Sequence, residues 1–99
     1  MKYISVVRAK LKGDNPRAMH DATVEKLSAM TRPLGAIGHQ PYLNPQDPSQ
    51  FLAVDTWNNL EQLQKFLSNP DVAAAFGQLF DGMPDVSIWG EAGWASFMD

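Results

Sequence analysis

Two histidines, one aspartate and one tryptophan are the residues of this chain whose types and spacing suit chemistry. His39 stands in "GHQPY", Asp55 and Trp57 close the run "FLAVDTW", and His20 lies on a predicted helix at the edge of its apolar stripe. A histidine titrates near neutral pH and can take a proton from a phenol. A tryptophan can stack on a flat ligand. These residue types favour acid/base chemistry on a small aromatic molecule.

Each of these residues also has a purely structural interpretation. Trp57 would pack in the core, His39 would be an exposed or hydrogen-bonded strand residue, and His20 would lie at the boundary of a helix face. Asp55 shares a strand face with Trp57, where an acid must be paired or hydrated. Arg8 on the first strand is its candidate partner, in an ion pair that serves a dimer interface or in a polar anchor for a ligand.

Other aromatic and amide side chains extend the set of candidate ligand contacts. Three tryptophans are many for 99 residues. They suit the wall of an aromatic cavity, and they equally suit a small core that needs large side chains. The additional aromatic candidates for ligand binding are Tyr42, Trp89 and Trp94, and Asn58 is a candidate only through the family resemblance described below.

The sequence excludes several other chemistries. The chain has no cysteine, so disulfides, thiolate nucleophiles and cysteine metal sites are absent. Two histidines without an H-x-x-x-H spacing predict no metal site. "GAIG" is not a phosphate-binding loop, and no serine lies in a nucleophile elbow. An enzyme built from these residues would use acid/base chemistry without a cofactor.

Charge and hydropathy limit the partners. The net charge of -3 argues against a nucleic-acid binder, which needs a basic patch. Seven of the eight basic residues lie between Lys2 and Arg32. The basic residues of this first third either form a solvated surface or attract an anionic ligand. The N-terminus is too charged for a signal peptide, and no apolar run approaches the ~20 residues of a membrane span. We therefore predict a cytoplasmic protein without membrane contact.

Hydrophobic periodicity predicts one domain, residues 1–99, with the order β-α-β-β-α-α-β. The first helix begins at its cap Asn15, and its apolar stripe comprises Met19, Thr23, Leu27, Met30 and Leu34. A second helix begins at a capping box from Asn58 to Glu61. Strands are predicted over 2–11, 36–43, 51–57 and 86–97, and helices over 16–32, 60–67 and 70–83.

Turns and bulges separate these elements. "NPQDPSQ" and "DGMPD" are predicted turns, and Gly90 and Gly93 are predicted bulge sites in the last strand.

This order suits an α+β, ferredoxin-like fold, in which helices cover one face of a four-stranded antiparallel sheet. The first and third strands carry apolar residues on both faces, so both faces must be buried. A second copy packed sheet to sheet would cover the free face. The pattern predicts a homodimer, and hence a dimeric barrel.

The stretch from Gly35 to Phe80 resembles the dimeric α+β barrel superfamily, and more narrowly the antibiotic-biosynthesis-monooxygenase-type domains. The resemblance is carried by a glycine that enters the second strand, the Asp47-Pro48 turn, the strand that ends in Trp57, and the "P-x-x-x-x-x-F" helix from Pro70. It implies a cofactor-free oxygenase that binds a phenolic or anthrone-like substrate between sheet and helices.

The sequence departs from some branches of that superfamily. The haem-degrading branch has a histidine on its third helix, which "DVAAAFGQLF" lacks, and the stress-responsive branch has one early in strand one, which "KYISVVRAK" lacks. Three functions remain open. They are a monooxygenase for an aromatic or polyketide-like molecule, a non-redox isomerase or cyclase that uses His39 or Asp55, and a non-catalytic ligand-binding dimer.

Overall fold

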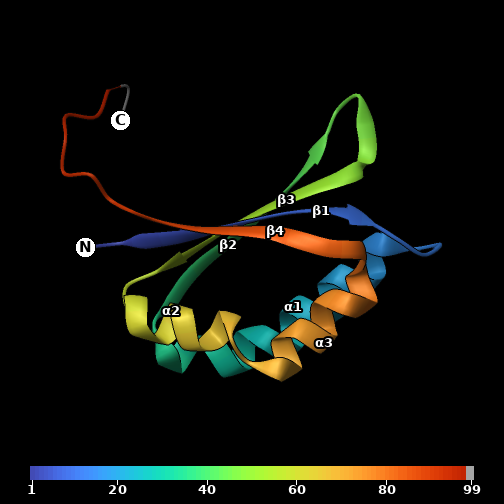
Figure 1. The fold of residues 1–99 in the computed structure, drawn as a ribbon, viewed down its shortest axis with the longest axis horizontal. Helices are drawn as coiled ribbons and strands as arrows, with labels where there is room; N and C mark the ends of the chain where they lie inside the picture. The colour runs from blue at the N-terminus through green and yellow to red at the C-terminus, as the bar shows by residue number, and fades with distance from the viewer. Residues whose placement is uncertain (98–99) are drawn as a thin grey trace.

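A computed structural model describes residues 1–97 of the protein. One antiparallel sheet in the order β2-β3-β1-β4 carries three α-helices on one face (Figure 1). This is the predicted α+β, ferredoxin-like class. The elements are β1 (Tyr3–Leu11), α1 (Pro16–Thr31), a 3₁₀ turn (Arg32–Leu34), β2 (Ala36–Asn44), β3 (Asp47–Trp57), α2 (Leu60–Leu67), α3 (Pro70–Leu79) and β4 (Phe80–Gly90).

The register of the two central strands decides which residues face the helices. In the β1–β3 pair, Ser5 lies opposite Asp55 and Val7 lies opposite Ala53. Side chains alternate between the two faces of a strand, so the odd-numbered residues of both strands point to the same side. Val7, Ala53 and Trp57 are buried, which shows that this side is the one under the helices.

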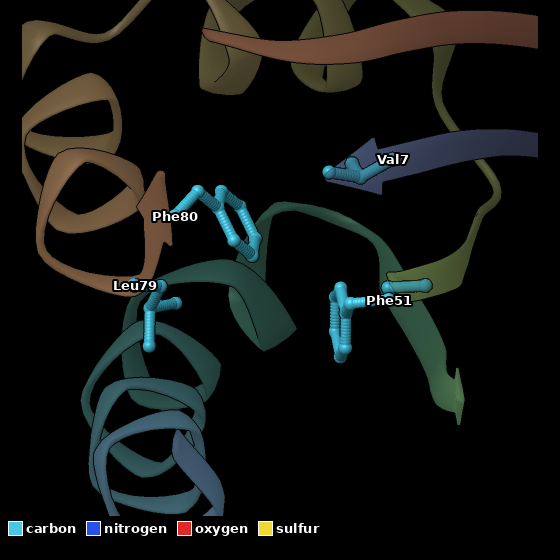
Figure 2. Close-up of a cluster of buried hydrophobic side chains, with 5 residues drawn as sticks. Val7, Phe51, Leu79 and Phe80 are labelled. Carbon is cyan, nitrogen blue, oxygen red and sulfur yellow. The ribbon is translucent and has the colours of Figure 1, made fainter. Parts of the chain in front are cut away.

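The main hydrophobic cluster lies where β1, β3 and the α3–β4 junction meet (Figure 2). The rings of Phe51 and Phe80 have centroids 5.6 Å apart, and Val7 and Leu79 complete the contact. Burying a large apolar side chain contributes roughly 1.5–3 kcal/mol. This cluster therefore fixes α3 against the sheet at one end of the molecule.

Asparagine caps start all three α-helices. The side chain of Asn15 accepts from the Ala18 backbone N–H at 3.1 Å, as the sequence predicts. The cap of α2 is Asn59, which accepts from the Gln62 N–H, so the predicted capping box at Asn58 is wrong by one residue. The two adjacent asparagines are chemically equivalent candidates, and the chain places the second one at the helix start.

The turn between β2 and β3 is shorter than predicted. The third strand begins at Asp47 and not at Phe51, so "NPQDPSQ" is mostly strand. Asn44 tightens this turn by accepting from the Gln46 N–H, and Asp47 accepts from Ser49. Hydrogen bonds from the Ser49 side chain and backbone lower the pKa of the exposed Asp47 carboxyl.

The last strand differs most from the prediction. It spans Phe80–Gly90 and includes "DGMPD", whereas the sequence predicts a helix to residue 83 followed by a turn. The bulge lies near Gly82, which has a φ of 85°, and not at Gly90 or Gly93. Residues 80 and 81 pair with Leu11 and Lys10 of β1, and this pairing overrides the local turn preference of the segment.

The inward face of α1 is rotated from the predicted stripe. Met19, Met30 and Leu34 are exposed, although the periodicity predicts them inside. The residues that face the sheet from α1 are smaller or more polar, namely His20, Thr23, Val24, Leu27, Ser28 and Thr31. Since they fill little volume, α1 leaves space between itself and the sheet.

Candidate active site

A cavity of about 460 Å³ lies between α1 and the sheet. This volume is within the range of about 300–1,000 Å³ that is typical of small-molecule pockets. The floor is made by inward residues of β1, β2 and β3, and the far wall by α2, α3 and the start of β4. Leu27, Ile37, Ala53 and Leu79 make much of its lining apolar.

Aromatic side chains form the deep part of this cavity. Trp57 is 2% exposed and its ring centroid lies 5.4 Å from that of Phe66. Phe51, Phe76 and Phe80 continue the aromatic lining at the opposite end. Trp57 is thus both a core residue and a wall of this cavity, and its stacking on a ligand stays a prediction.

His39 and Asp55 meet at this cavity across the β2–β3 pair. They occupy opposite positions in the register, and His39 Nδ1 hydrogen-bonds to Asp55 Oδ1. Both side chains are partly buried, at 28% and 22% exposed. His39 is therefore the partner that Asp55 requires on an otherwise apolar strand face.

Arg8 is not that partner. It has the opposite parity to Ser5 and Val7 on β1, and it lines a groove on the helix-free face of the sheet. The expected pairing of Arg8 with Asp55 is wrong because the sheet separates the two side chains.

His20 reaches the same site from α1. Its Nε2 lies 3.0 Å from Nε2 of His39, and the two imidazole rings meet edge to edge, with centroids 5.2 Å apart and an angle of 26° between their planes. Its Nδ1 lies 3.0 Å from Oδ1 of Asp21. The side chain of His20 is 12% exposed. It is therefore a cavity residue and the link between α1 and β2.

Four other predicted ligand contacts lie outside the cavity. Tyr42 and Trp89 line the groove on the helix-free face. Trp94 is 85% exposed and follows the end of β4. Asn58 is exposed at the joint between β3 and α2, where its backbone N–H donates to the Gly35 carbonyl.

Ser5 and Asp21 are site residues that the sequence analysis did not single out. Ser5 is 1% exposed, and its Oγ lies 3.5 Å from Oδ2 of Asp55. The sequence signal for Ser5 is its position. It lies between Tyr3 and Val7 on the face of the first strand that points to the helices, where an apolar residue is expected. The adjacency of Asp21 to His20 is a weaker signal, since most surface helices carry acids.

Within residues 1–97, no three His, Cys, Asp or Glu side chains gather at a spacing that would hold a metal ion. Over the same range, no helix has the length and apolar character that crossing a membrane requires.

Comparison with known proteins gives a match in structure and none in sequence. No family model matches the chain, and no curated protein does. Solved structures match over nearly the whole length. SnoaB, a cofactor-independent oxygenase from Streptomyces nogalater, has a TM-score of 0.73 at 14% identity, covering 99% of this chain and 98% of its own.

Two further structures are described as proposed antibiotic biosynthesis monooxygenases. The protein from Deinococcus radiodurans has a TM-score of 0.71 at 17% identity and covers 98% of this chain and 99% of its own. That from Nitrosomonas europaea has a TM-score of 0.70 at 16% identity, with 93% and 91% covered. The chain thus has the fold of the antibiotic-biosynthesis-monooxygenase proteins, as the resemblance predicted. At these identities the likeness concerns the fold.

Proposed function

We propose that this protein is a small cofactor-independent monooxygenase that acts on an aromatic or polyketide-like molecule, with Asp55 and His39 as its catalytic pair. The observation that carries the proposal is the hydrogen-bonded pair His39–Asp55 at the edge of an aromatic-lined cavity. A carboxylate in such a place is positioned to take a proton from a bound molecule. The cofactor-independent oxygenase SnoaB, which shares the fold, supports the same class of reaction.

The roles of the two residues follow from their contacts. Both ring nitrogens of His39 are engaged, one by Asp55 and the other by His20. The acceptor for the substrate proton is therefore the Asp55 carboxylate, which has its second oxygen toward Ser5. His39 orients this carboxylate and exchanges a proton with it.

Oxygenation then needs only the substrate and dioxygen. Loss of a proton makes a phenol or anthrone electron-rich, so that it can pass an electron to dioxygen. In an anthrone, one oxygen atom replaces the two hydrogens of the ring methylene group to give a carbonyl, and the second oxygen atom leaves with these hydrogens as water. In a phenol, the hydroxyl hydrogen and one ring hydrogen are lost as water in the same way, and the product is a quinone. The apolar walls of Trp57 and Phe66 exclude water and strengthen the electrostatic interactions inside the cavity.

The helix-free face of the sheet supports a homodimer. Ile4, Val6 and Leu52 border a shallow groove there together with Tyr42 and Trp89, and Val54 lies opposite Val6 on the same face. No element within residues 1–97 covers these side chains. A second copy packed sheet to sheet would bury these side chains. A cytoplasmic location remains a prediction from the sequence.

The test is to mix the protein with a panel of phenols, quinols and anthrones while tryptophan fluorescence and dissolved oxygen are followed in one cuvette. Quenching together with oxygen uptake is the expected result. Quenching and product formation without uptake would instead indicate an isomerase or cyclase. Quenching without any conversion would indicate a ligand-binding dimer, and both of these outcomes contradict the oxygenase.

A further inference from the structure

We infer that His20 and Asp21 form the outer half of a proton path that leads from Asp55 in the cavity to water. The inference rests on the proposed function, because it assigns a route to the proton that Asp55 removes from the substrate. Three contacts define the path. They are Asp55 Oδ1 to His39 Nδ1, His39 Nε2 to His20 Nε2 at 3.0 Å, and His20 Nδ1 to Asp21 Oδ1 at 3.0 Å.

The three inner side chains of the path are partly buried, with His39 28% exposed, and only the outer end is well exposed. Asp55 lines the cavity with its side chain 22% exposed, and the side chain of His20 is 12% exposed. Asp21 at the other end is 63% exposed, so it is in contact with water. The path therefore joins a partly enclosed acid to a solvated one through two imidazoles.

Each imidazole has one ring nitrogen hydrogen-bonded to an aspartate and the other hydrogen-bonded to the second histidine. A proton relay requires this arrangement, because a proton enters at one nitrogen and leaves from the other. In the inner state, protonated Asp55 donates to Nδ1 of His39, His39 donates from Nε2 to His20, and His20 donates from Nδ1 to ionised Asp21. Neutral imidazole has one donor nitrogen and one acceptor nitrogen, so all three hydrogen bonds are satisfied.

Three proton transfers convert the inner state into an outer state. Asp55 gives its proton to Nδ1 of His39, His39 gives its Nε2 proton to Nε2 of His20, and His20 gives its Nδ1 proton to Asp21. All three hydrogen bonds are again satisfied, with their directions reversed. Asp21 then releases one proton to water, which balances the one taken from the substrate, and the histidines regain their starting tautomers by exchange with water.

The tautomers of the two histidines depend on each other, because only one of the two Nε2 atoms can carry the proton of the hydrogen bond between them. Without the extra proton, Asp21 and Asp55 compete for the Nδ1–H tautomers of His20 and His39. Removal of Asp21 should therefore shift His39 toward its Nδ1–H form, although Asp21 contacts only His20. Removal of Asp55 should shift His20 toward its own Nδ1–H form.

The experiment is ¹⁵N NMR of the histidine rings in the full chain, comparing wild type with Asp21→Ala and Asp55→Ala. Glu25→Ala is the matched control, since it removes an exposed acid one turn further along α1. We expect reciprocal tautomer shifts at the distant histidine in the first two variants and none in the control. An unchanged His39 in Asp21→Ala would overturn the path, and a bound metal ion on the two Nε2 atoms would overturn it too.

A second readout uses turnover. His20→Gln should lower kcat about tenfold or more with KM unchanged, and added imidazole should restore the rate, because a diffusing base replaces the missing relay group. A fall in kcat that imidazole does not restore would show that His20 has a structural role. The NMR experiment needs no substrate, so a failure of the oxygenase proposal would be seen separately as absent oxygen uptake.

Discussion

At the scale of single residues, Trp57 has two tasks, because it packs in the core and also lines the cavity. It is nearly fully buried against Phe66, and it is also a wall of the cavity. A chain of 99 residues buries only about two thirds of its unfolded surface, so each large side chain matters for the core. The stability of the core and the shape of the cavity therefore depend on the same indole ring.

Replacement of Trp57 should separate these tasks by side-chain size. Trp57→Ala should lower the free energy of unfolding by about 3–5 kcal/mol in urea denaturation, because it opens a large void in the core. Trp57→Phe should fold with a smaller loss and abolish most ligand-dependent quenching. Trp94→Ala is the control, and it should change stability by less than about 0.5 kcal/mol because Trp94 is exposed. Equal effects of the two alanine variants would contradict the core role of Trp57.

The residue types of the site could be predicted from sequence, but their contacts could not. His39, Asp55 and Trp57 stood out because polar or very large side chains interrupt an apolar strand. The contact between His39 and Asp55 depends on the β2–β3 register, which the chain sets at a turn shorter than its prolines suggest. Arg8 was misplaced because charge alone does not tell which face of a strand a residue occupies.

At the scale of elements, α1 explains why a cavity exists. Thr31 is its only buried residue within the described part of the chain, whereas the shorter α3 buries both Val72 and Leu79. The inward positions of α1 carry His20, Thr23 and Ser28, which are too small or too polar to fill the space above the sheet. The sequence predicted this helix and the inward position of Thr23, Val24 and Leu27 correctly, but the methionines of the predicted stripe are exposed.

The joint between α1 and β2 depends on Gly35. This residue has a φ of 112°, and a Cβ there would overlap the Asn58 side chain. Gly35→Ala should cost at least roughly 1–2 kcal/mol of unfolding free energy, since L-residues avoid the left-handed region. Gly77→Ala in α3 is the matched control. It meets nothing within 4 Å and should stabilise the helix by about 0.5–1 kcal/mol. Both free energies can be measured by urea denaturation, and a destabilised Gly77→Ala would contradict this account.

The start of α2 offers a second test at this scale. Asn59→Ala should lower the free energy of unfolding by about 1 kcal/mol, because the Gln62 N–H loses its cap. Asn59→Ser should keep most of that stability, since serine is a comparable cap. Thermal melts of the two variants distinguish them, and an equally low melting temperature for both would assign Asn59 a role other than capping.

At the scale of the whole molecule, the two faces of the sheet are unequal. One is covered by three helices and holds the cavity, and the other has no covering element in residues 1–97 (Figure 1). The order of elements predicted that the helices cover one face. The apolar residues on both faces of the two central strands predicted that the other face is apolar as well. The start of β4 at Phe80 was not predictable, because it depends on pairing with β1, which is about 70 residues away in the sequence.

The homodimer proposal can be tested by placing a charge on the free face. Val54→Glu should convert the dimer to monomer in sedimentation velocity, because position 54 lies opposite Val6 and Gln40 and a carboxylate buried there would have no cation directly across from it. Gln64→Glu adds the same group on the exposed side of α2 and should leave the dimer intact. Circular dichroism of both variants controls for folding. A wild-type protein that sediments as a monomer would contradict the proposal.

The central claim is that Asp55 removes a proton from a molecule bound in the cavity. Oxygen uptake by wild type and Asp55→Asn tests it most directly, with the phenolic substrate that wild type consumes fastest. We expect kcat to fall about 100-fold or more in Asp55→Asn while the ligand is bound equally well. Asp71→Asn removes an exposed acid from the first turn of α3, away from the cavity and from the helix-free face, and should retain full activity. Undiminished oxygen uptake by Asp55→Asn would contradict the claim.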